Sequence, residues 1–132
     1  MKPYLILAVL CLWLSACHSV RRINIENRTN DEAEITWVIK EDSIHKSHLY
    51  LSNSDTVRFY LKNKAPHNRL KLSAGKGSWT SAELINFADD LKFVKLKWNG
   101  HFIKLDSTKD IKDFLMLRRK GIDNSQVNIV LK

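Results

Sequence analysis

Cys11 and Cys17 are the two cysteines of this chain, and the residues around Cys17 indicate the chemistry that its thiol undergoes. Cys17 follows the tripeptide Leu14-Ser15-Ala16, which ends an uncharged run that begins at Tyr4. Small residues at such a position let a peptidase reach the backbone. The thiol itself can form a thioether to a lipid. An uncharged run that ends in small residues favours a secretory signal with a cleavage site near Cys17.

This arrangement resembles the lipobox of bacterial prolipoproteins, in which an aliphatic residue and two small residues precede the lipid-bearing cysteine. The resemblance covers residues 1–17 only. It implies that residues 1–16 are a cleaved signal peptide and that Cys17 carries a covalent lipid, with no other cofactor. An ordinary signal peptide and an uncleaved anchor are the alternatives. The fifteen residues from Pro3 to Cys17 fall short of the ~20 that a spanning helix needs.

The residues after Cys17 indicate where such a lipoprotein would reside. The residue after the cysteine is His18, whereas an aspartate there would resemble an inner-membrane retention signal. The acidic run of surface-displayed lipoproteins is also missing from the next residues. The resemblance therefore implies the outer membrane, with the protein facing the periplasm. Residues 17–22 are expected to form a lipid-anchored tether. In it, Arg21 and Arg22 either contact anionic head groups or cap the first strand in solvent.

Length and charge predict one basic domain, residues 23–132. Of the 132 residues, 116 remain once the 16 of the signal are removed, enough to bury a core without disulfides. The chain has 22 Lys and Arg against 14 Asp and Glu, and six basic but no acidic residues between Thr56 and Ala82. Because the signal peptide implies export, nucleic acid is not an expected partner of this basic domain. Anionic lipid, lipopolysaccharide, peptidoglycan or an acidic protein face is expected, unless the basic surface is merely solvated.

Alternation of apolar and polar residues predicts a mainly β (α+β) fold. We expect an antiparallel, β-sandwich-like sheet of about eight short strands, with two short helices inserted in the C-terminal half. The strand patterns cover residues 23–26, 33–40, 48–51, 57–62, 69–72, 94–98, 101–105 and 127–131. The first two strands are expected to form a hairpin around a turn at residues 27–31.

Two helices are expected late in the chain. The first begins at the capping-box sequence Thr80-Ser81-Ala82-Glu83 and ends near Asp90. The second begins near Asp106, and its last turn holds Arg118-Arg119-Lys120, where cations suit the helix dipole. Gly121 would then end this helix.

Asn99-Gly100 marks the clearest hairpin, because this dipeptide favours a type I′ turn. A two-residue turn there pairs Trp98 with His101 and leaves the apolar residues of both strands on one face. The same register places Lys95 opposite Lys104 and Lys97 opposite Phe102 on the other face. Two lysines directly opposite each other repel, so this face is either solvated or binds an anion.

Two groups of residues are therefore candidates for anion binding. The first is a basic–aromatic sheet face, formed by Arg58, Tyr60, Lys62, Lys95, Lys97, Phe102 and Lys104. The second is a nest of backbone N–H groups at Gly75, Lys76 and Gly77, before the first helix. The alternative for the glycines is that they only supply the backbone angles of the junction.

Catalytic motifs are not evident. His45 and His48 lack the cysteine pair of a zinc finger, so no metal site is expected. One residue separates Gly75 from Gly77, whereas a P-loop has four residues between its glycines. No nucleophile-elbow sequence marks a serine triad. We therefore expect no enzyme.

Three functions remain as hypotheses. The first is a non-catalytic, membrane-anchored envelope lipoprotein that acts by protein contact in the periplasm. The second is a binder of an anionic envelope component (lipopolysaccharide, peptidoglycan or anionic lipid) through the basic–aromatic face. The third, and least expected, is an enzyme.

Overall fold

The computed structural model describes residues 19–44 and 54–132, which form two four-stranded sheets and two α-helices. The strands are β1 (Val20–Asn27), β2 (Ala33–Ile39), β3 (Thr56–Leu61), β4 (Arg69–Lys76), β5 (Leu91–Trp98), β6 (His101–Leu105), β7 (Arg119–Lys120) and β8 (Gln126–Leu131). The helices are the 3-10 turn η1 (Glu41–Ser43), α2 (Ser81–Asp89) and α3 (Thr108–Met116). The predicted mainly β, sandwich-like class with two helices is confirmed.

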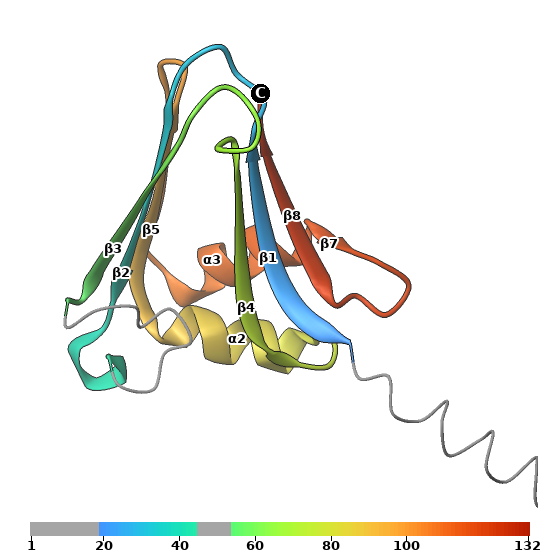
Figure 1. The fold of residues 1–132 in the computed structure, drawn as a ribbon. Coiled ribbons are helices and arrows are strands. Elements are labelled where there is room, and N and C mark those ends of the chain that lie inside the picture. The colour runs from blue at the N-terminus through green and yellow to red at the C-terminus, as the bar shows by residue number, and fades with distance from the viewer. Residues whose placement is uncertain (1–18, 45–53) are drawn as a thin grey trace, which may run out of the picture.

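The two sheets form a wedge, converging at one end and spreading apart toward the helices at the other (Figure 1). One sheet has the strand order β4-β1-β8-β7, and the other has the order β3-β2-β5-β6. Neighbouring strands are antiparallel except for β1 and β8, which are parallel. Helices α2 and α3 pack against each other and against β5, so they cover the open end of the wedge.

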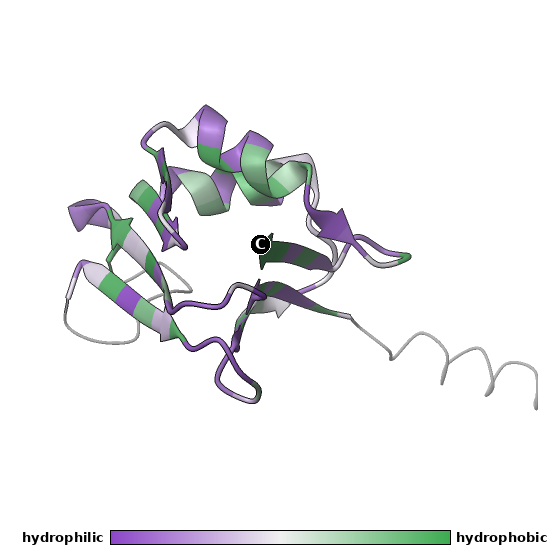
Figure 2. Cartoon of the chain, turned by 90° about the horizontal axis from the view of Figure 1, so that it is seen from above, coloured by the Kyte–Doolittle hydropathy of each residue, from purple (hydrophilic) through white to green (hydrophobic). Residues whose placement is uncertain are grey.

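The core lies between the two sheets and the helices. Apolar residues alternate with polar ones along the strands, and each helix carries an apolar stripe (Figure 2). Phe87 of α2 connects the layers: its ring lies edge-on to Trp37 of β2, with centroids 5.8 Å apart, and edge-on to Trp79, with centroids 5.5 Å apart. All three aromatic side chains are buried, and such edge-to-face pairs add to the hydrophobic gain.

Both helices begin at a hydroxyl cap, which was expected at Thr80 for the first helix. The Thr80 hydroxyl accepts a hydrogen bond from the Glu83 N–H at 3.2 Å, and the Ser107 hydroxyl accepts one from the Asp110 N–H at 3.0 Å. The predicted end of the second helix is wrong. Helix α3 ends at Met116, and Arg119 and Lys120 form strand β7 instead, because they pair with β8.

The predicted hairpin of the first two strands is also wrong. Strand β1 pairs with β4 and β8, whereas β2 pairs with β3 and β5 in the other sheet. The turn after Asn27 therefore connects the sheets at the narrow end of the wedge. The first strand also begins at Val20, three residues earlier than expected, so part of the predicted tether belongs to the sheet.

The β5–β6 hairpin has the predicted register. Trp98 pairs with His101, Lys97 with Phe102, and Lys95 with Lys104. Asn99 and Gly100 have φ values of 42° and 76°, as a type I′ turn requires. Local turn chemistry and the apolar pattern thus fix the same alignment.

Several expectations fall on residues outside the described ranges: the signal peptide 1–16, Cys17, the strand at residues 48–51, and His45 and His48. Within the described ranges, no helix is both long enough and apolar enough to cross a membrane.

Candidate functional site

The outer surface of the β3-β2-β5-β6 sheet brings the predicted basic–aromatic residues together. One row across the sheet runs Arg58, Thr36, Lys95, Lys104, and the next runs Tyr60, Glu34, Lys97, Phe102. The alternate residues of these strands, such as Ile35 and Leu96, are buried in the core. Six of the seven predicted residues therefore share one face, which we call the basic–aromatic face.

Lys62, the seventh predicted residue, lies just beyond the end of β3 and is exposed. Its backbone carbonyl accepts a hydrogen bond from Asn27 Nδ2 at 3.2 Å, which ties this corner to the turn between the sheets. Lys62 thus sits at the margin of the face.

The two opposed lysines of this face have aromatic partners. Lys95 Nζ lies 5.4 Å from the ring centroid of Phe102, and Lys104 Nζ lies 5.2 Å from that of Phe93. Lys104 Nζ is also 3.6 Å from the Asp106 carboxylate. Cation–π contact and an ion pair offset the repulsion between the amines. These side chains are therefore organised over rings, although contact with solvent keeps each interaction weak.

Sequence reasoning missed the acidic part of this face. Glu34 lies between Tyr60 and Lys97 and accepts a hydrogen bond from the Thr36 hydroxyl at 3.2 Å. A hollow of about 270 Å³ opens beside it, lined by Asp31, Glu32, Glu34, Tyr60, Lys97, Trp98, Asn99 and Gly100. The face is therefore basic over one row and mixed in charge over the other. Glu34 lies on this face because β2 pairs between β3 and β5. No local sequence pattern predicts that pairing.

Two large aromatic side chains are exposed on the same face. Tyr60 is 57% exposed and Phe102 is 56% exposed, and they stand at opposite ends of the row that contains Glu34 and Lys97. Exposed aromatics beside charges of both signs are typical of surfaces that bind another macromolecule.

The glycine segment is occupied by its own chain. Gly77 N–H donates to the Ser19 carbonyl at 2.7 Å, and Gly75 lies against the Arg21 guanidinium. Helix α2 starts only at Ser81. The contact to Ser19 favours the alternative in which these glycines, with φ of 88° and 96°, shape the junction.

Arg21 is not a solvent-exposed cation of a tether. Its side chain is only 12% exposed, forms an ion pair with Glu83, and lies over the Trp79 ring at 5.5 Å. The expectation that Arg21 contacts head groups or solvent is therefore wrong, because this arginine packs on α2. Arg22 is exposed, as expected.

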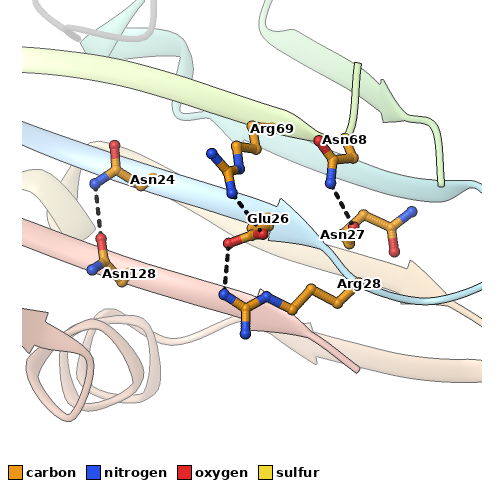
Figure 3. A network of polar contacts seen from close by, with 7 residues as sticks. All are labelled: Asn24, Glu26, Asn27, Arg28, Asn68, Arg69 and Asn128. Carbon is orange, nitrogen blue, oxygen red and sulfur yellow. Dashed lines mark hydrogen bonds and ion pairs between the residues drawn. The ribbon is translucent and has the colours of Figure 1, made fainter. Parts of the chain in front are cut away.

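A second polar cluster covers the outer surface of the β4-β1-β8 part of the other sheet (Figure 3). Asn24 Nδ2 donates to Asn128 Oδ1 at 2.8 Å. Glu26 accepts hydrogen bonds from Arg28 at 3.1 Å and Arg69 at 3.2 Å. The bond from Arg28, helped by Arg69, lowers the pKa of the Glu26 carboxyl. The sequence carried a signal for this cluster, since these residues alternate with core isoleucines.

The network beside it holds the loops in place. Asn68 Nδ2 donates to the Asn27 carbonyl at 3.4 Å (Figure 3). A hollow of about 310 Å³ lies over the cluster, and in its lining Glu26 pairs with Arg28 and Arg69. Lys71 of the same lining has no carboxylate within ion-pair distance among the described residues. Among the described residues, no group of three or more His, Cys, Asp or Glu side chains could hold a metal ion.

Comparisons of this chain with protein-family models, with curated proteins and with solved structures found no match. The sequence and the geometry therefore carry the functional argument.

Proposed function

We propose that this protein is a small envelope lipoprotein, anchored by a lipid on Cys17 to the outer membrane, that acts without catalysis by binding a protein through its basic–aromatic face. The cysteine follows a lipobox-like tripeptide, Leu14-Ser15-Ala16. The observation that carries the binding role is the row Tyr60, Glu34, Lys97, Phe102. In it, two exposed aromatic rings flank a pair of opposite charges.

This row fits a protein partner better than a small anion. Aromatic residues and arginine are enriched where proteins meet, whereas a phosphate needs converging cations in a concave site. The hollow on this face is instead lined by three carboxylates, Asp31, Glu32 and Glu34. A partner with both apolar and basic groups would complement it.

The anchor is tested by intact mass and detergent partition of the protein with Cys17 and with Cys17→Ala. We expect the parent to lose residues 1–16, gain the mass of acyl chains and enter the detergent phase. The Cys17→Ala variant should gain no acyl mass and should stay out of the detergent phase. Cleavage without added lipid would leave a plain exported protein and overturn the anchor.

The binding face is tested by placing a photoreactive amino acid at Phe102 in living cells. We expect a discrete protein adduct that Tyr60→Ala weakens. The same reagent at Val130, which is exposed on the other sheet, is the control. Adducts of equal yield at both positions, or at neither, would overturn the proposed face.

A second candidate is an anionic envelope component, and one observation favours it. The row Arg58, Thr36, Lys95, Lys104 has three cations and no acid. Changing Lys95, Lys97 and Lys104 to glutamine should then weaken capture on lipopolysaccharide or peptidoglycan beads, most of all at low salt. Unchanged capture would remove this candidate.

A further inference from the structure

The anchored end of the fold presents a surface of its own. Ser19, the first described residue, is fixed to the domain because its carbonyl accepts a hydrogen bond from the Gly77 N–H at 2.7 Å. Its hydroxyl, together with the hydroxyl and the N–H of Ser125, lowers the pKa of the Asp123 carboxyl to about 2, which places Asp123 near the start of β1. The start of β1 is thereby held between the end of β4 and the β7–β8 loop (Figure 1).

This attachment restricts where a lipid on Cys17 can lie. Two peptide units join Cys17 to Ser19, and an extended chain gains at most about 3.6 Å per residue. The lipidated residue would therefore stay within about 7 Å of Ser19. A bilayer that holds this lipid must lie beside the residues that surround Ser19.

Five exposed residues surround this point, and we call them the anchor rim: Val20, Arg22, Lys76, Lys120 and Ile122. Val20 pairs with Lys76 across β1 and β4. Arg22 and Lys120 both pair with Gln126 of β8, one on each side. Ile122 is next to Asp123, whose pKa the Ser19 hydroxyl helps to lower, and the Ile122 side chain is fully exposed.

The anchor rim has the composition of a membrane-contacting surface. Among the described residues, none of its three cations has a carboxylate within ion-pair distance. Of the nearby acids, Glu83 is paired with Arg21, whereas Asp123 stays ionised beside Ile122, so three cations outnumber one carboxylate at this end of the domain. Basic residues near an anionic leaflet are attracted to it, and an exposed isoleucine gains by entering the interface.

We infer that the anchor rim is a second, non-covalent membrane contact that lays this end of the domain on an anionic phospholipid surface. The inference rests on the proposed lipid anchor. The lipid would supply the anchorage, and a basic patch beside it adds electrostatic attraction to an anionic leaflet. The rim would also set the orientation, because contacts of its cations and Ile122 with the bilayer near the lipid would resist tilting of the domain.

The test uses the lipidated protein in vesicles of phosphatidylethanolamine and phosphatidylglycerol. Once residues 1–16 are removed and Cys17 is acylated, Ile122→Cys carries the one free thiol and takes an environment-sensitive fluorophore. We expect a blue-shifted emission that a quencher in the bilayer reduces. The matched control is Phe102→Cys, which is exposed on the other sheet and should be quenched little.

Charge supplies a second readout on the same label. Lys76→Gln with Lys120→Gln should lower the ratio of bilayer-inserted to solvent-exposed label by about fivefold for each lysine removed. Vesicles of phosphatidylcholine alone, or high salt, should reduce that ratio in the parent in the same direction.

The outcomes separate the inference from the proposed function. Acylated, vesicle-bound protein with equal quenching at positions 122 and 102 would overturn the anchor rim and leave the lipoprotein intact. Protein without lipid that fails to bind vesicles would overturn both. Quenching at position 122 that is insensitive to the lysine variants and to salt would overturn the electrostatic part.

Discussion

Asn27 Nδ2 donates a hydrogen bond to the Leu61 carbonyl at 3.0 Å, and this contact joins the end of one sheet to the end of the other. The same nitrogen lies 2.8 Å from the Asp31 carbonyl, and Asn27 Oδ1 accepts from the Thr29 hydroxyl at 2.7 Å. Asn27 is fully buried. The Asn27 side chain thus connects β1 to the end of β3 at a turn where β1 and β2 do not pair with each other.

Asn27→Ala should therefore destabilise the fold strongly. The substitution leaves buried carbonyls without a donor, and we expect a loss of about 3 kcal/mol in the free energy of unfolding. Urea unfolding measures it. Asn63→Ala removes an exposed hydrogen bond of 2.7 Å from Asn63 Nδ2 to the Asn30 carbonyl in the same region. It should lower the free energy of unfolding by less than about 0.5 kcal/mol. Equal losses in the two variants would contradict the role of Asn27.

Gly75→Ala and Gly77→Ala form a matched pair. Both residues have a positive φ, so each substitution carries a backbone cost of about 1–2 kcal/mol. A Cβ at Gly75 would also lie 2.9 Å from Arg21 Nη2, whereas a Cβ at Gly77 meets nothing within 4 Å. Gly75→Ala should lower the melting temperature more than Gly77→Ala. The reverse order would show that Arg21 does not pack as described.

Trp79→Phe should cost more stability than Trp37→Phe. Both side chains are buried, so both substitutions lose similar apolar area. Trp79 Nε1 donates to the Arg22 carbonyl at 3.1 Å, whereas Trp37 Nε1 is buried without a partner in the described part of the chain. Only the first substitution removes a hydrogen bond, which adds about 1 kcal/mol to its cost. Denaturant unfolding of both variants measures the difference.

Asp123→Asn should change how stability depends on pH. Hydrogen bonds from Ser19, and then from Ser125, lower the pKa of Asp123 from an ordinary 3.8 to about 2. A lowered folded-state pKa stabilises the fold above the ordinary value, and the benefit disappears as the pH falls through the folded-state value. The parent should thus be more stable than Asp123→Asn near neutral pH, and the gap should close between about pH 4 and pH 2.

Thermal unfolding at a series of pH values checks this expectation. Ser125→Ala removes a weaker contributor to the same pKa and should give a smaller pH effect. A constant gap between the parent and Asp123→Asn across this range would contradict the assigned pKa.

The sequence predicts what is local. The β5–β6 hairpin was aligned residue by residue because Asn99-Gly100 dictates its turn and Leu96 and Ile103 dictate its face. The start of the first helix followed from the capping box at Thr80, and the start of the second was expected near Asp106, next to its observed cap Ser107. Short-range backbone chemistry leaves few alternatives at such positions.

Partners that lie far apart along the chain were not predictable. The alternation around Ile23 and Ile25 specifies a strand but not its neighbours, which are β4 and β8. The end of α3 was missed for the same reason, because Arg119 and Lys120 pair with β8 instead of continuing the helix.

The candidate face shows both limits at once. Alternation placed Arg58 with Tyr60, and Lys95 with Lys97, on the same side of their own strands. That these strands flank β2, with Glu34 between them, depends on pairings over dozens of residues. The basic character of the face was therefore predictable, and its acidic end was not.

The parallel alignment of β1 with β8 has a consequence for how the chain acquires its structure. Arg22 pairs with Gln126, about a hundred residues further along, so β1 stays an open edge until β8 has emerged. A chain that still lacks β8 cannot complete this sheet. Pairing between residues so far apart in the sequence also slows folding. Slow closure would keep the polypeptide unfolded for longer, which is what the export required by the proposed lipoprotein anchor would need.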